Sequence, residues 1–261
     1  MRDFADRIKR LLVGRPVPSG ALGETLLPKR IALPVFASDA LSSVGYAPDE
    51  VLITLAVAGV VATSLSPWVA LAVVGVLAVV VASYRQTVHA YPSGGGDYEV
   101  VSANLGSHAG LLVASALLSD YVLTVAVSVS SGTSYLAAAL PALVPYKVEI
   151  AVAVVTVLAV LNMRGSRESG RAFAIPTYLY MGVIGIMAVA GLVQELTGTL
   201  GRAESAGFDV VTHAGWEHGL TGLAGGFLVL RAFSSGCAAL TGVEAISNGV
   251  PSFQRPKSRN A

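Results

Sequence analysis

Three acidic residues lie inside otherwise apolar stretches of this chain: Asp39, Asp120 and Glu244. A charge within a bilayer costs several kcal/mol, so an acid at such a place indicates a functional role. Hydroxyl side chains accompany these acids: Thr124 and Ser128 follow Asp120 at helical spacing, Thr241 precedes Glu244 at helical spacing, and Tyr46 follows the expected break in the first apolar stretch. Carboxylate and hydroxyl oxygens, together with the carbonyls of a broken helix, suit a hard cation better than an organic substrate. The sequence therefore predicts a cation site built from these seven residues.

Other interpretations of the same residues remain open. Thr124 and Ser128 could donate to carbonyls of their own helix, as hydroxyls in membrane helices often do. Asp120 could be a structural acid paired with Arg231. Asp49 and Glu50 are interpreted as facing an aqueous vestibule rather than as ligands.

Three carboxylates around one monovalent ion would over-compensate its charge. At least one of them is therefore expected to be protonated in some state. Glu244 is the first candidate for carrying this proton, and Asp120 is the second.

The elements that must position these residues are membrane helices. The chain has 261 residues, a mean hydropathy of +0.68 and only 13% charged residues, whereas a soluble domain carries about 25%. Each crossing needs roughly 20 apolar residues. We predict an all-α polytopic membrane protein with six spans between residues 31 and 250, at Ile31–Ala62, Pro67–Ala90, His108–Leu140, Val148–Leu161, Phe173–Leu196 and Leu220–Val250.

Residues 1–30 are expected to form a cytoplasmic segment with a possible amphipathic helix, and residues 251–261 the start of a cytoplasmic loop. Basic residues support this orientation. They gather at four places that fall on one side of the membrane if the spans alternate: Lys29–Arg30, Arg85, Arg164–Arg171 and Arg255–Arg259. The positive-inside rule then places the N-terminus in the cytoplasm.

The first and sixth spans share an interrupting pattern. "ALSSV" begins at Ala40 and "ALTGV" begins at Ala239, both among small residues. In a six-span chain these two segments cross the membrane in opposite directions. An inverted repeat of five spans, with the first helix of each repeat broken, predicts this arrangement. The second repeat would then be incomplete, so we expect the chain to be the first part of a longer transporter.

Several function classes are disfavoured. The net charge of +1 does not imply a nucleic-acid partner, and the single Cys237 excludes an internal disulfide. No nucleophile–base pair or metal-ligand spacing is evident among the four histidines, so neither an enzyme nor a bound cofactor is expected.

Five motifs together resemble the KimA-type high-affinity potassium importers of the amino acid–polyamine–organocation superfamily. The motifs are "FASDALSSVGYAPDE", "YPSGGGDYEV", "LLSDYVLTVAVSVSSG", "LNMRGSRESG" and "RAFSSGCAALTGVEAISNGVP", and the resemblance covers nearly the whole chain from Leu33 to Ala261. The resemblance implies a LeuT-like fold with discontinuous first and sixth helices, potassium as the transported ion and a proton as the coupling ion. It also implies a site at the same seven residues, from Asp39 to Glu244.

The resemblance further implies a homodimer in the plasma membrane. Regulation by cyclic di-AMP would act through a C-terminal domain beyond this sequence. Two alternatives stay open. An amino acid or polyamine permease of the same superfamily is one, although Asp39 would repel an amino acid carboxylate. A membrane sensor or assembly subunit that transports nothing is the other.

Overall fold

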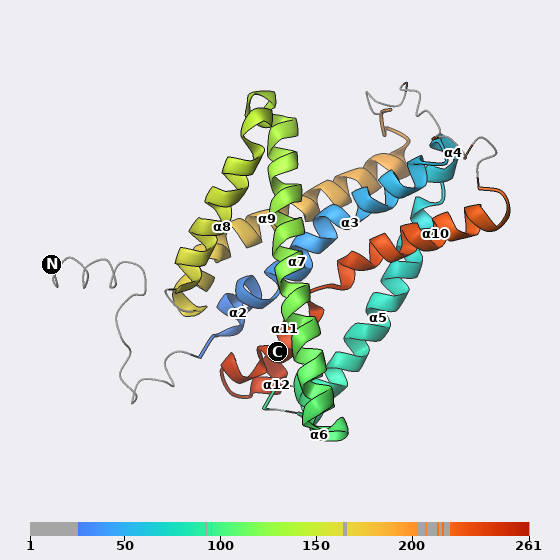
Figure 1. The fold of residues 1–261 in the computed structure, drawn as a ribbon. Coiled ribbons are helices and arrows are strands. Elements are labelled where there is room, and N and C mark those ends of the chain that lie inside the picture. Colours follow the sequence, from blue (N-terminus) through green and yellow to red (C-terminus); the bar gives the residue numbers. More distant parts are fainter. Residues whose placement is uncertain are drawn as a thin grey trace. The chain divides into compact units, whose positions relative to one another are not determined.

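A computed structural model describes residues 26–91, 93–94, 96–163, 166–202, 207, 213, 216 and 220–260. These residues form helices and no β-strand, apart from one isolated bridge between Leu27 and Phe253, so the all-α prediction is confirmed. The predicted amphipathic helix near the N-terminus lies outside the described residues. The helices (Figure 1) are α2 (Lys29–Phe36), α3 (Ser38–Ala56), α4 (Val60–Thr63), α5 (Ser66–Ala90), α6 (Asp97–Leu105), α7 (Ser107–Ala139), η2 (Pro141–Tyr146), α8 (Lys147–Met163), α9 (Ser166–Thr197), α10 (Gly222–Gly236), η4 (Cys237–Leu240), α11 (Val243–Asn248), η5 (Val250–Ser252) and α12 (Lys257–Asn260).

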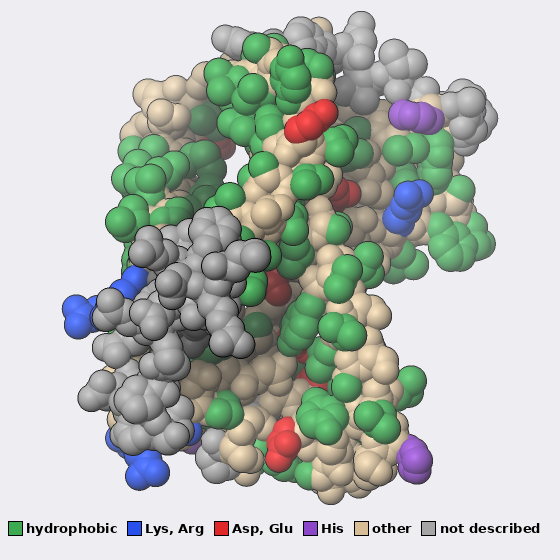
Figure 2. All heavy atoms as spheres, turned by 60° about the vertical axis from the view of Figure 1, so that its left-hand side comes forward, with side chains coloured by type: hydrophobic (Ala, Val, Ile, Leu, Met, Phe, Trp, Pro, Cys, Tyr) green, Lys and Arg blue, Asp and Glu red, His purple; other side chains and the backbone are tan. Residues whose placement is uncertain are grey.

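Five helical stretches in the described part of the chain are long and apolar enough to cross a membrane. They are Val60–Ala90, Ser107–Ala139, Pro141–Met163, Gly170–Thr197 and Gly222–Asn248, and they overlap the second to sixth predicted spans. Apolar side chains cover much of the visible surface, with few charged ones among them (Figure 2). Leu112, for example, is 75% exposed. Such a surface belongs in lipid, so this is a multi-pass membrane protein.

The first predicted span is indeed interrupted, but the position of its break was predicted wrongly. Residues 40–45 are helical, and the break falls earlier, at Ala37 between α2 and α3. The run of small residues is compatible with a helix because its hydroxyls find partners on other segments. Pro48 inside α3 still has no N–H to donate to the carbonyl of Val44, so one carbonyl of this run lacks its usual helical partner.

The break in the sixth span lies where the sequence predicts it. Helix α10 ends at Gly236, η4 follows, and a turn at Thr241–Gly242 precedes α11. Gly242 has a φ of +81°, a left-handed conformation that glycine adopts without steric cost. Asp39 lies in the first turn of α3 and Glu244 in the first turn of α11. Each of these two acids therefore follows a break directly.

The chain divides into two compact units. The first comprises residues 1–43, 80–174 and 241–261. In it, α6 packs against α7, and α7 against α8. The residues before α2 also meet the residues after α11. Leu27 exchanges two main-chain hydrogen bonds with Ser252 and Gln254, of 2.8 and 3.1 Å, and Phe36 stacks on Phe253 with ring centroids 5.4 Å apart.

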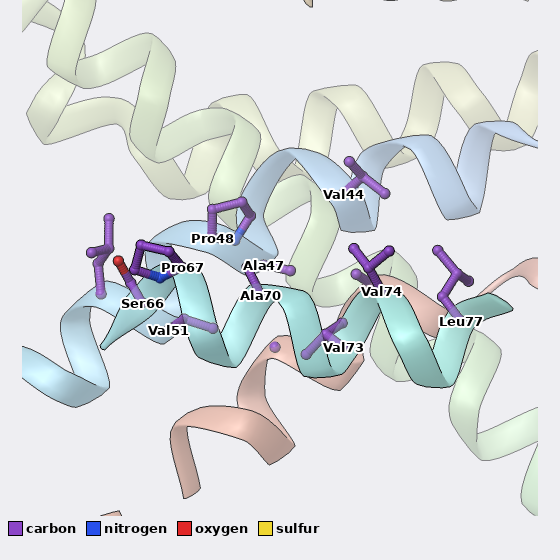
Figure 3. Close-up of a pocket in the computed structure, with 13 residues that line it drawn as sticks. Val44, Ala47, Pro48, Val51, Ser66, Pro67, Ala70, Val73, Val74 and Leu77 are labelled. Atoms are coloured by element: carbon purple, nitrogen blue, oxygen red, sulfur yellow. The ribbon is translucent and has the colours of Figure 1, made fainter. Parts of the chain in front are cut away.

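The second unit comprises residues 44–79 and 175–240. Its core contains Val51, Leu55, Val69, Leu228 and Ala232, from α3, α5 and α10. Beside this core lies a groove of about 380 Å³, lined mainly by α3 and α5 (Figure 3). Its lining contains a single polar side chain, Ser66, so the groove offers almost no ligand for a charged substrate.

The contact between α9 and α2 depends on Gly170. A Cβ at Gly170 would lie 2.5 Å from Val35 Cγ2 and 2.8 Å from Ile31 Cγ2. We expect Gly170→Ala to lower stability by about 1–3 kcal/mol, because α2 must move away. Gly191 on the same helix has no atom within 4 Å of such a Cβ. Gly191→Ala is therefore expected to stabilise the helix by about 0.5–1 kcal/mol.

Thermal unfolding of the two purified variants in detergent measures this difference. Equal midpoints for Gly170→Ala and Gly191→Ala would contradict the described packing of α9 on α2.

Candidate cation site

The site begins where the two helix breaks meet. A Cβ at Gly242 would lie 2.6 Å from the main-chain N of Ala40 and 2.7 Å from Cβ and Cγ of Asp39. The start of α3 therefore packs directly against the main chain of the second break. Any side chain at Gly242 would displace Asp39, which makes glycine necessary for this approach as well as for the positive φ.

Two pairs of hydroxyl groups connect α3 to its neighbours in the same unit. The Oγ atoms of Ser42 and Ser128 are 3.2 Å apart, and Ser43 Oγ lies 2.7 Å from Thr241 Oγ1. Ser42 also donates to the main-chain carbonyl of Asp39 at 2.8 Å. Because its only proton is used there, Ser128 must be the donor in the contact with Ser42. Ser43 is fully buried.

One side of α7 carries Asp120, Thr124 and Ser128, and these three residues are buried or partly buried. Thr124 is buried at 9% exposure, while its neighbours Leu123 and Val125 are 63% and 49% exposed. Asp120 and Ser128 are partly buried, at the same helical phase as Thr124. Ser128 contacts α3, whereas the exposed Ser119 donates to a carbonyl of its own helix. Ser128 therefore has a hydrogen-bond partner on another helix, which the interpretation of a bond to a carbonyl of its own helix does not account for.

The three intramembrane acids belong to one unit and affect one another. Asp120 interacts electrostatically with both Asp39 and Glu244. In the described part of the chain, no group of three or more His, Cys, Asp or Glu side chains is placed to hold a metal ion. The region around Asp39 contains one carboxylate and several neutral hydroxyl oxygens. Such a set fits a weakly hydrated monovalent ion rather than a divalent one.

One oxygen of Asp39 has no partner. Its Oδ1 is buried and makes no hydrogen bond with the described residues. An unpaired buried carboxylate oxygen is expensive, and a bound cation would remove that cost. The hydroxyls of Ser42 and Ser43 lie on the following turn of α3, and Gly242 lies against the Asp39 side chain.

Glu244 has a different environment from Asp39. Tyr121 Oη donates to Glu244 Oε1 at 2.7 Å, and Asn248 Nδ2 donates to Tyr121 Oη at 3.0 Å. The sequence analysis did not include Tyr121 among the site residues, although this tyrosine directly follows the intramembrane acid Asp120. Ser42 and Ser43 were also missed as partners, because they were interpreted only as residues that break the helix.

Tyr46 lies in the other unit, at 6% exposure. It is seven residues after Asp39 on α3, which is nearly the same helical phase. Its role in the site stays a prediction, as does a pairing of Asp120 with Arg231, which also belongs to the other unit. Glu50 is exposed.

The potassium transporter KimA of Bacillus subtilis (strain 168) is 44% identical to this chain over 254 residues, which are 97% of the chain and 40% of the transporter. The chain thus spans less than half the length of this relative. The sequence pattern of the amino acid permease family matches residues 35–261. A permease family also agrees with the prediction that the chain is not an enzyme. This chain belongs to the amino acid permease family.

Proposed function

We propose that the full-length transporter to which this chain would contribute imports potassium by proton symport. The observation that carries this proposal is the buried, unpartnered Oδ1 of Asp39 beside two pairs of hydroxyl groups. The name of the Bacillus relative supports potassium as the ion. Potassium and the proton are substrates here, and no cofactor is proposed.

The roles of the site residues follow from their surroundings. Asp39 would supply the negative ligand, and the hydroxyls of Ser128, Thr124 and Thr241 would replace water around the ion. Asp120 would add to the negative potential without contacting the ion.

Glu244 would carry the coupling proton rather than bind potassium. It is held by Tyr121 and interacts electrostatically with Asp120. A protonated Glu244 would reduce the repulsion among the acids of this unit while potassium is absent. Asp120 is the second candidate for this role.

Transport would proceed by alternating access. The breaks at Ala37 and at Thr241–Gly242 lie directly beside the site. Small changes of the backbone at these breaks would open the site first to one side and then to the other. We propose that the N-terminus faces the cytoplasm, because the loops rich in Lys and Arg would share that side. Homodimerisation and regulation by cyclic di-AMP would depend on segments outside this chain.

Removal of the Asp39 charge tests the site. We expect Asp39→Asn to lower potassium uptake at limiting potassium by at least about tenfold, equal to 1.4 kcal/mol, because the cation loses its negative ligand. Glu50→Gln removes an exposed acid from the same helix and should leave uptake within about twofold. Uptake is measured with the full-length transporter in a bacterium that lacks its own potassium uptake systems, at equal membrane expression.

Equal uptake by Asp39→Asn and the unmodified transporter would contradict the proposed site. Absence of rescue by the unmodified transporter, despite good expression, would contradict potassium import. Competition by putrescine or spermidine would then favour the polyamine permease.

The contact between Ser43 and Thr241 gives a second prediction. We expect Ser43→Ala and Thr241→Val each to raise the apparent KM for potassium several-fold, by about 0.5–1.5 kcal/mol. The double variant should be no worse than the more severe single variant, because both remove the same hydrogen bond. Additive effects in uptake kinetics would show that the two hydroxyls act independently. Ser119→Ala, which changes an exposed hydroxyl, is the matched control.

A further inference from the structure

Helices α7 and α8 leave a groove between them on the surface of the first unit. The groove has a volume of about 420 Å³ and is lined by the second half of α7 and the first half of α8. Much of its wall is apolar, and Val148 and Val152 in it are 73% and 61% exposed. No described segment therefore packs over these side chains, which belong to a surface that lies in lipid.

The two ends of the groove differ in polarity. Lys147 begins α8 and Ser134 lies near the end of α7, so both belong to the end at the connection of the two helices. Neither side chain forms a hydrogen bond or an ion pair with the described residues. At the other end, Thr156 donates its hydroxyl proton to the carbonyl of Val152 at 2.8 Å. That end offers no free donor, whereas the Lys147 end offers a cation and a hydroxyl.

The groove has nearly the length of one lipid leaflet. Along α8 it extends from Lys147 to Thr156, which is about 13 Å of helix. The hydrocarbon core of one leaflet is about 15 Å thick, half that of the bilayer. Lys147 directly precedes the fourth predicted span, at the interface that the alternation of the spans assigns to the outer side. The groove then runs from the outer interface toward the middle of the bilayer.

We propose that this groove binds one phospholipid of the outer leaflet with a negatively charged headgroup. The ammonium group of Lys147 pairs with the lipid phosphate, and the hydroxyl of Ser134 donates to a headgroup oxygen. One acyl chain lies between α7 and α8, against Val129, Val152 and Val155. The apolar stem of a lysine can follow such a wall while its charge stays at the interface. The site concerns the membrane helices alone, so the lipid is bound whatever ion is transported.

A lipid fits the groove better than a further protein helix. An α-helix with its side chains is about 10–12 Å across, so it would lie over the groove, whereas an acyl chain is narrow enough to enter it. A protein segment would also have to bring an acid to Lys147 at the edge of the membrane, which is costly. A phospholipid carries its negative charge at this depth in any case.

The groove and the cation site lie on opposite sides of α7. Ala126 and Ser130 line the groove, and each is two residues from Ser128, which contacts α3. Two residues turn an α-helix by about 200°, so these side chains point away from that of Ser128. The bound lipid therefore supports the back of the helix that carries Thr124 and Ser128.

The test uses phosphatidylglycerol with a photoreactive group in its acyl chain. The full-length transporter is reconstituted in phosphatidylcholine vesicles with a small fraction of this probe and irradiated, and labelled peptides are identified by mass spectrometry. We expect residues 126–134 and 147–156 to be labelled at least about fivefold more than α9, whose exposed side chains contact bulk lipid. Unlabelled phosphatidylglycerol should compete, and additional phosphatidylcholine should not.

Variants at Lys147 test the headgroup contact. Lys147→Gln removes the charge and should lower labelling of the groove peptides about fivefold, whereas Lys147→Arg should retain it. Arg202→Gln neutralises a basic residue that does not line the groove, and it should leave the labelling unchanged.

Ala151→Phe tests the acyl chain independently of the charge. Its ring fills the groove while Lys147 remains, so labelling of the groove peptides should fall although the headgroup contact is intact. Ala153→Phe changes an exposed alanine of α8 that does not line the groove, and it is the matched control.

Three results would overturn the proposal. Labelling spread evenly over the lipid-exposed helices would show only a general lipid shell. Groove peptides that stay unlabelled while α9 is labelled would show that another part of the full-length transporter covers the groove. Equal labelling by phosphatidylglycerol and phosphatidylcholine probes, unchanged in Lys147→Gln, would exclude recognition of a negative headgroup. None of these readouts requires potassium uptake, so they are independent of the proposed function.

Discussion

The close approach of α3 to Gly242 is the constraint on which the site depends. It places the first turn of one interrupted helix against the main chain of the other interruption. The hydroxyl contacts from Ser42 and Ser43 can form only because α3 lies this near to α7 and to Thr241. A larger residue at Gly242 would separate these segments and leave four hydroxyls and one carboxylate without their arrangement.

The acids of the first unit divide into two environments. Asp39 lies beside neutral hydroxyls and has one buried oxygen without a hydrogen-bond partner among the described residues, whereas Glu244 accepts a hydrogen bond from the phenol of Tyr121. Under the proposed symport, the same type of side chain would bind a metal cation in one place and a proton in the other. The two ions would then be bound without competing for the same oxygens.

Much of this arrangement was accessible from the sequence. The apolar runs gave five of the spans because hydropathy and length decide whether a helix crosses a bilayer, and acids in such runs stood out because of their cost. The position of the first break was missed, because Ser42–Gly45 resembles a helix-breaking run while Ala37 carries no such signal. Tyr121 was missed as the partner of Glu244, since only the tertiary fold brings α7 to α11.

The contact between the two ends of the membrane segment has a topological consequence. Leu27, before α2, pairs through its main chain with Ser252 and Gln254, after α11. Two points of a chain that touch lie at the same membrane face, so the polypeptide between them crosses the bilayer an even number of times. The helices in the described part of the chain that are long and apolar enough to cross are five, an odd number. Parity therefore requires one more crossing, and the interrupted pair α2 and α3 is the segment that can supply it.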